Sequence, residues 1–152
     1  MHPRLRLSRR EWRYFVQISE SLNLVLSERK LLTERFYTEK LFKNHPEFVP
    51  YFDGVNMKVQ SMMLMMALQG VVCFFGGGNY PAVEQYLQYL GTRHRKFGIP
   101  QELFPKFCDA LMATIAEFHG ESWDEELADQ WRAALAGATK IMLEGYRQDF
   151  HV

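Results

Sequence analysis

Apolar residues recur at intervals of three and four along most of this chain, and this spacing constrains the fold more than any other feature. Such spacing is typical of helices that bury one face. One clear run holds Leu103, Phe104, Phe107, Leu111 and Ile115. No segment of useful length alternates apolar and polar residues, as a half-buried strand would. We therefore predict an all-α protein.

Prolines, glycines and capping motifs occur at wide intervals and mark the expected helix boundaries. The stretches Ser8–Glu11 and Ser122–Glu125 have the capping-box pattern of a helix start. Pro46 ends one helix, and the three glycines at 76–78 end another. The expected helices begin near Ser8, Ser27, Val55, Pro81, Pro100 and Ser122, with a short element from Pro46 to Phe52. With the last helix running to about Phe150, this makes about seven helices in a single domain of residues 1–152.

The composition limits the environment and the partners of the chain. The 18 basic and 18 acidic residues balance, so no nucleic-acid partner is expected. The longest apolar run, Met62–Leu68, is too short to span a membrane, and the N-terminus lacks the apolar block of a signal peptide. Cys73 and Cys108 lie in apolar contexts, as free thiols of a reducing compartment do, which favours a cytoplasmic location.

Familiar catalytic motifs do not occur in the sequence, and one histidine stands out. There is no P-loop, GxGxxG, HExxH or CxxC pattern, and the glycines at 76–78 lack a following Lys-Ser/Thr. We predict no catalytic residues from spacing. His94 lies within an amphipathic helix, one turn after Leu90 and two after Tyr86. Taken alone, it could simply interact with the end of that helix.

Three stretches of the chain resemble the globin family, and the bacterial single-domain haemoglobins in particular. The stretch "FYTEKLFKNHPEFVPYF" (36–52) is similar to the second globin helix and its proline corner, with Phe52 six positions after Pro46. The stretch "QSMMLMMAL" (60–68) is similar to the distal helix. The stretch "LGTRHRKFGI" (90–99) is similar to the proximal helix, whose histidine binds haem iron. The resemblance implies a globin fold around a haem pocket.

The resemblance also implies a cofactor and its ligand. The cofactor is haem b, and His94 is the expected iron ligand, with its inner N–H donating to the carbonyl of Leu90. A haem needs a flat apolar slot. The side chains expected to form that slot are Phe52, Met63, Leu64, Ile99 and Phe104. No second histidine lies near the distal position, so we do not expect two histidines on the iron.

Two distal hydrogen-bond donors are expected, and the position of one is ambiguous. Counting along the distal helix puts Gln60 over the iron, although it could also be a surface residue. Bacterial haemoglobins often carry a Phe-Tyr-x-x-Leu-Phe motif, and here one extra residue separates Tyr37 from Leu41. Counting from Pro46 puts Thr38 in the pocket, and counting from Phe36 puts Tyr37 there. We prefer Tyr37, which a helix bulge would turn inward, because a phenol donor suits an oxygen pocket.

The resemblance leaves three functions open. The first is reversible binding of O2, NO or CO, with NO detoxification possible if a separate reductase serves the haem, because no flavin or nicotinamide domain is expected. Flavohaemoglobins place a tyrosine and a glutamate beside the proximal histidine. Here Phe104 stands at the tyrosine's position, and the glutamate's position falls on or near Tyr146, with Glu144 two residues away. This replacement weakens the case for peroxidase-like chemistry. The alternatives are a gas or redox sensor and a haem-free interaction module; either a monomer or a homodimer is compatible with the sequence.

Overall fold

A computed structural model of the chain describes residues 9–76 and 80–147, with the side chains of 10–16 left out. In this part of the chain every regular element is helical, which confirms the prediction of an all-α fold. The elements are α1 (Arg9–Ser27), α2 (Arg29–Glu34), η1 (Arg35–Phe42), η2 (Pro46–Phe52), α3 (Met57–Phe75), α4 (Pro81–Lys96), α5 (Leu103–His119), η3 (Gly120–Ser122) and α6 (Glu125–Arg147). Because η1 continues α2 without a break and η3 is a single turn, these elements form about seven helices, as predicted.

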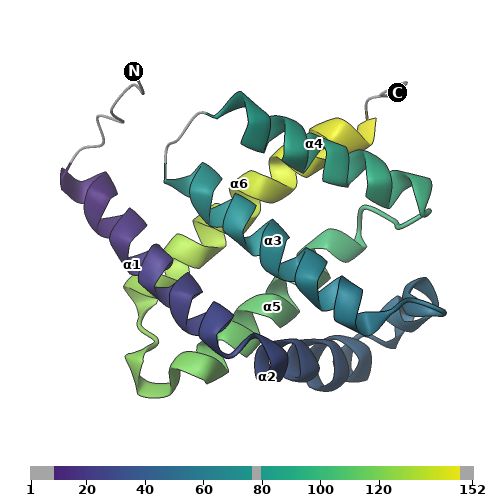
Figure 1. The fold of residues 1–152 in the computed structure, drawn as a ribbon, viewed down its shortest axis with the longest axis horizontal. Helices are drawn as coiled ribbons and strands as arrows, with labels where there is room; N and C mark the ends of the chain where they lie inside the picture. The colour runs from purple at the N-terminus through teal and green to yellow at the C-terminus, as the bar shows by residue number, and fades with distance from the viewer. Residues whose placement is uncertain (1–8, 77–79, 148–152) are drawn as a thin grey trace.

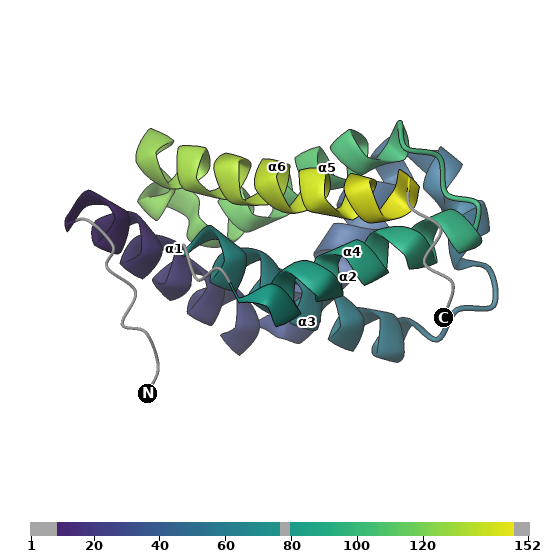
Figure 2. The same ribbon diagram turned by 90° about the horizontal axis from the view of Figure 1, so that it is seen from above.

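The helices pack in crossing layers around one apolar core. α3 crosses in front of α6 in Figure 1, and the view from above places α1 and α3 on one side and α5 and α6 on the other (Figure 2). α4 packs most extensively on α6 (Figure 1). The core is filled by large side chains with almost no exposed surface, among them Ile18, Leu32, Phe36, Leu68, Leu111 and Trp131.

Local signals explain where the helices around the site begin and end. Asn56 caps α3, because its side-chain oxygen accepts the N–H groups of Lys58 and Val59 at 3.0 and 3.3 Å. Pro81 opens α4, where the missing N–H costs nothing. Gly98 ends α4 with a φ of 72°, a conformation that suits glycine, and the predicted end is therefore confirmed.

Two of the predicted boundaries are wrong in detail. α5 begins at Leu103, after a turn in which the Leu103 N–H donates to the carbonyl of Pro100. The predicted capping box at Ser122 does not form, since the Ser122 hydroxyl donates back to the carbonyl of His119. Asp124 caps α6 instead, and accepts the N–H of Leu127 at 2.8 Å. The other predicted box at Ser8, and the predicted helix end at Phe150, lie outside the described residues.

The segment from α2 to η2 combines three kinds of helix. After six residues of α-helix in α2, the chain widens into a π-helix over Arg35–Phe42. It then turns at Pro46 into the 3-10 helix η2. A π-turn holds one more residue than an α-turn, so it shifts the direction of the side chains that follow it. This shift decides which residue of the segment faces the core.

α3 is the helix of the described segments that is long and apolar enough to cross a membrane by length and composition. It has 19 residues and a mean hydropathy of 1.4, and 28% of its apolar window is buried inside the protein. Core helices of soluble proteins pass the same criterion. The packing of α3 against α1, α4 and α6 is that of a helix within a bundle.

Both cysteines are free thiols, as the sequence predicted. Each is partly buried. The Sγ of Cys108 lies 3.6 Å from the Thr139 hydroxyl oxygen, and burial raises the pKa of this thiol. A thiol held protonated in this way is a poor nucleophile.

Candidate functional site

His94 lies in the last turn of α4 with one ring nitrogen already engaged. Its Nδ1 donates to the carbonyl oxygen of Leu90 at 2.6 Å, one helical turn back. The ring packs edge-on against Phe104 of α5, with the ring centres 5.6 Å apart. Burial lowers the pKa of His94, although the bond to Leu90 partly opposes this shift. The imidazole is therefore held neutral and oriented, and Nε2 keeps a lone pair for another ligand.

Phe104 and Tyr146 extend this cluster toward α6. The two rings pack nearly perpendicular, with centres 6.2 Å apart. The Tyr146 hydroxyl donates to the carbonyl oxygen of Ile99 at 3.0 Å, in the turn that follows α4. Phe104 itself is buried. Phe104 thus packs on His94 and Tyr146 packs on Phe104, and neither side chain supplies a carboxylate to the imidazole.

Tyr37 and Gln60 meet through a hydrogen bond between η1 and α3. The Nε2 of Gln60 donates to the Tyr37 hydroxyl oxygen at 3.1 Å. Tyr37 is only 3% exposed. Burial raises the pKa of Tyr37 to about 12, and the bond from Gln60 opposes this only in part. The phenol therefore stays protonated at neutral pH, and since its oxygen accepts from Gln60, its own proton is available to another acceptor.

The π-helix explains why Tyr37 rather than Thr38 turns inward. Tyr37 is buried, whereas Thr38 is exposed. The wider turn of η1 accommodates the one extra residue between Phe36 and Pro46. Motif positions counted from Phe36 therefore put Tyr37 at the inward-facing position. The burial of Tyr37 therefore favours Tyr37 over the alternative with Thr38.

Aromatic rings surround the Tyr37 phenol. Phe52 packs on Tyr37 and on Phe42, with ring centres 5.4 and 5.1 Å apart. Phe42 closes the triangle at 5.9 Å from Tyr37. The role of Phe42 was missed from the sequence, although it is the last residue of the motif that begins at Phe36. This triangle ties η1 to η2 and keeps the hydroxyl in apolar surroundings.

The expected slot residues are not all enclosed. Leu64 is 6% exposed, and Phe52, Leu90 and Ile99 are partly buried. The place of Met63 against the porphyrin stays a prediction, since its side chain is 50% exposed in the structure. The reason for this exposure is helical geometry, because Met63 is rotated by about 100° from Leu64 on α3 and points away from the core.

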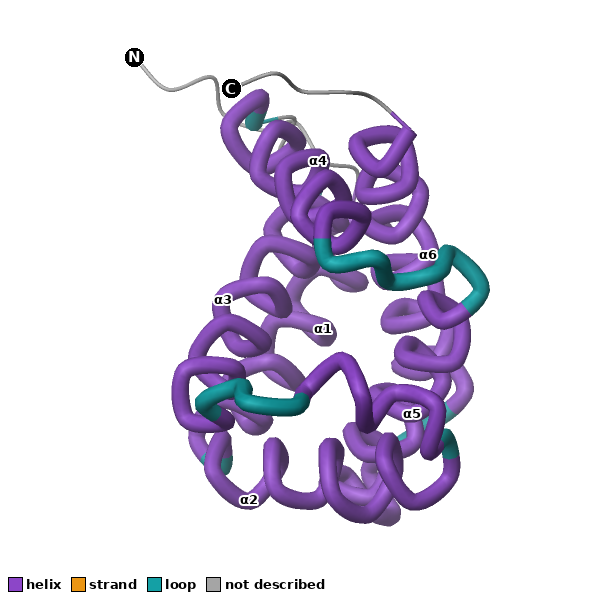
Figure 3. Tube along the Cα trace, turned by 90° about the vertical axis from the view of Figure 1, so that its right-hand side faces the viewer, coloured by secondary structure: helices purple, strands orange, loops and turns teal. Residues whose placement is uncertain are grey.

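The elements that carry these residues surround one region of the fold. Figure 3 shows α3 to the left of it, α4 above it, and α5 and α6 to the right. No cluster of three or more His, Cys, Asp or Glu side chains occurs in the described part of the chain that could hold a metal ion by itself. A porphyrin brings four nitrogens of its own, so the single free nitrogen of His94 matches the donor set that a haem requires.

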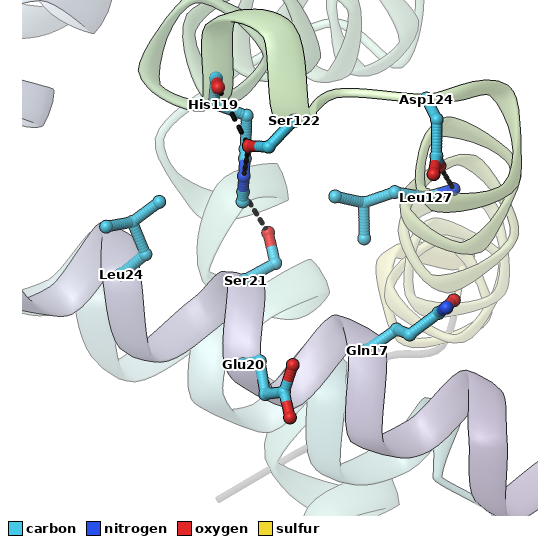
Figure 4. Close-up of a pocket in the computed structure, with 8 residues that line it drawn as sticks. All are labelled: Gln17, Glu20, Ser21, Leu24, His119, Ser122, Asp124 and Leu127. Atoms are coloured by element: carbon cyan, nitrogen blue, oxygen red, sulfur yellow. Dashed lines mark hydrogen bonds between the residues drawn. The ribbon is translucent and has the colours of Figure 1, made fainter.

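A separate polar cluster joins α1 to the corner between α5 and α6 (Figure 4). The Ser21 hydroxyl accepts the indole N–H of Trp131 at 2.9 Å and donates to Nε2 of His119 at 2.6 Å. His119 in turn donates from Nδ1 to Ser122 at 3.2 Å. The cluster borders a hollow of about 280 Å³ that contains none of the predicted site residues. These bonds tie α1 to the corner between α5 and α6.

Comparison with known proteins identifies the family. The sequence profile described as Globin matches residues 35–142, which is most of the chain and includes Tyr37, Gln60 and His94. The chain belongs to the globin family.

Relatives of this globin come from bacteria and plants. A Bacillus thuringiensis flavohemoprotein is 30% identical over 122 residues, 78% of this chain and 29% of the relative. An anaerobic nitrite reductase of Gossypium hirsutum is 29% identical over 66% of this chain and 64% of its own length. The globin therefore spans less than a third of the flavohemoproteins that it matches.

Solved structures share the same fold. A Pseudomonas aeruginosa protein described as structurally highly homologous to human hemoglobin superposes with a TM-score of 0.76 at 22% identity, over 89% of this chain and 99% of the other. A hexacoordinated heme protein from a tardigrade superposes with a TM-score of 0.74 at 16% identity, over 97% and 100% of the two chains. At these identities the similarity is one of fold.

Proposed function

We propose that this globin binds haem b through Nε2 of His94 and reversibly binds a diatomic gas, with oxygen the preferred ligand. The neutral and oriented imidazole supports the first part of the proposal. Leu64, Phe104 and Phe52 would supply apolar contacts to the porphyrin. The heme proteins among the relatives and structural neighbours support the same assignment.

The hydrogen bond from Gln60 to Tyr37 is the observation that carries the choice of oxygen. A haem held here would supply the iron that binds the gas, and bound oxygen would carry more partial negative charge than bound carbon monoxide. Because the Tyr37 oxygen already accepts from Gln60, its O–H proton is free to donate toward the gas. A buried donor facing a partly charged acceptor forms a stronger bond than a neutral pair does. Tyr37 would therefore favour oxygen over carbon monoxide.

Replacing Tyr37 by phenylalanine tests this proposal. A hydrogen bond to a charged group contributes about 1.5–3 kcal/mol, and each 1.4 kcal/mol is about tenfold in an equilibrium constant. We expect Tyr37→Phe to raise the oxygen dissociation rate roughly ten- to a hundredfold and to change carbon monoxide release far less. Stopped-flow mixing of the oxygenated protein with carbon monoxide measures the first rate. Gln60→Leu should have a smaller effect, because it leaves the phenol donor in place but unoriented.

Thr38→Val is the matched control, since it removes a neighbouring hydroxyl that is exposed. It should leave both rates unchanged. If neither Tyr37→Phe nor Gln60→Leu altered oxygen release, the pocket would hold oxygen by apolar enclosure alone. A gas sensor with a different distal trigger would then be the better proposal.

Phe52 provides a second test, because it packs on Tyr37 and would lie against the porphyrin. Removing a buried phenylalanine side chain costs about 3–5 kcal/mol. Phe52 is only partly buried, so we expect Phe52→Ala to lower the free energy of unfolding by less than this range and to speed haem transfer to an acceptor protein. Urea titration and transfer kinetics measure the two effects. Transfer kinetics equal to those of the unaltered protein would contradict this placement of Phe52.

The proximal side favours gas binding over peroxidase-like chemistry. His94 donates to a backbone carbonyl, and the residues beside it, Phe104 and Tyr146, offer no carboxylate. A carboxylate partner would make the imidazole more anionic and a stronger electron donor to iron. Turnover of nitric oxide would need electrons from a reductase, which we propose to be a separate protein.

A further inference from the structure

α4 and α6 cross with their backbones in direct contact. A Cβ atom on Gly91 would lie 1.7 Å from the carbonyl oxygen of Met142, and one on Gly145 would lie 2.0 Å from the carbonyl oxygen of Gln88. Real side chains do not tolerate such distances, so only glycine permits this approach at both positions. The position of α4 relative to α6 is therefore closely restricted along this part of the helix.

A buried threonine adds a directional bond at the same crossing. Thr92 is 6% exposed, and its hydroxyl donates to the carbonyl oxygen of Gly145 at 2.9 Å. The carbonyl of Gln88 in its own helix is farther away, at 3.2 Å. Gly145 lies in the last turn of α6, where carbonyl groups lack a partner within the described helix. The Thr92 hydroxyl thus gives this acceptor a partner from another helix.

A second side chain of α4 reaches the same end of α6. The Nη1 of Arg95 donates to the carbonyl oxygen of Tyr146 at 3.3 Å. A cation at a helix C-terminus interacts favourably with the partial negative charge there. Thr92 and Arg95 lie on either side of His94 in the sequence, so both bonds act on the turn of α4 that carries the imidazole.

We propose that Thr92 is a positioning residue for His94, holding the proximal turn of α4 against α6 so that the iron–histidine bond keeps one length and direction. This inference rests on the proposed binding of haem through His94. The carbonyl of Leu90 orients the His94 ring. The contacts of Gly91 and Thr92 with α6 fix the backbone that links Leu90 to His94. Because this contact is with a second helix, the turn of α4 that carries His94 cannot move away from α6 without breaking the bond from Thr92 to Gly145.

The experiment compares Thr92→Val with Thr114→Val in the haem-reconstituted protein. Valine keeps the shape of threonine and removes the hydroxyl. Thr114 is also buried and donates at 2.8 Å to the carbonyl of Ala110, but that bond stays within α5. For Thr92→Val we expect the iron–histidine stretching band of the ferrous protein, measured by resonance Raman spectroscopy, to shift and broaden. Haem transfer to an acceptor protein should become about tenfold faster, as loss of one buried hydrogen bond implies.

Thr114→Val should leave the band unchanged, and Thr92→Ser, which keeps the hydroxyl, should restore it. A band in Thr92→Val identical to that of the unaltered protein would overturn the proposal, whatever the change in stability. Equal changes in the two valine variants would also overturn it, because the effect would then be general destabilisation. If the unaltered protein bound no haem, both the proposed function and this inference would fail. If the unaltered protein bound haem and the band of Thr92→Val were unshifted, only the inference would fail.

Discussion

His94→Gly should abolish tight haem binding. The reconstituted variant is expected to transfer its haem to an acceptor at least about a hundredfold faster, because loss of even an outer partner of a metal ligand costs about 10- to 100-fold. Its ferrous spectrum should no longer show a nitrogen ligand on iron. Added imidazole should restore the spectrum in part, since a free ring can enter the space that the side chain leaves.

His119→Gly is the control for this experiment. It removes a second histidine, away from the candidate site. The His119 ring is held by the side chains of Ser21 and Ser122 at the corner of α5 and α6. We expect a lower free energy of unfolding for this variant but an unchanged ferrous spectrum. Normal haem retention and an unaltered spectrum in His94→Gly would contradict the assignment of the iron ligand.

Gly145→Ala and Gly137→Ala should change stability in opposite directions, although both place the same methyl group in α6. Alanine in a helix interior is favoured over glycine by about 1 kcal/mol. A Cβ on Gly137 meets only a ring atom of Phe74 at 4.0 Å, so this variant should gain stability. A Cβ on Gly145 would lie 2.0 Å from the Gln88 carbonyl oxygen, so α4 must move away. Overpacking of this kind costs about 1–3 kcal/mol and occasionally more.

Urea unfolding of the haem-free protein measures both variants without reference to any ligand. Thermal unfolding provides a second reading, in which a change of 1 kcal/mol corresponds to about 2–4 °C for a chain of this size. Gly91→Ala should resemble Gly145→Ala, because its Cβ would meet the Met142 backbone on the other side of the crossing. A gain in stability for Gly145→Ala equal to that for Gly137→Ala would show that the two helices do not touch there.

The sequence by itself was sufficient for the helices and for the local surroundings of His94. Apolar spacing, Pro46, Pro81 and Gly98 are local signals, and the structure has helix boundaries at or near each of them. The bond from His94 to the Leu90 carbonyl is also local, since helical geometry alone brings residues four apart together. Such features depend on a few neighbouring residues, so they can be predicted without knowing what packs against them.

Only the tertiary structure decided which residue of the second helix is buried and how close α4 comes to α6. The π-turn that buries Tyr37 and exposes Thr38 is not encoded by a local motif. It is favoured by contacts with Phe52 and with Gln60, which lies 23 residues away. The crossing at Gly91 and Gly145 likewise joins residues more than fifty positions apart. The conformational preference of glycine is the same wherever it occurs in a helix. Glycine is required at this crossing because any Cβ atom would collide with a backbone carbonyl of a helix distant in the sequence.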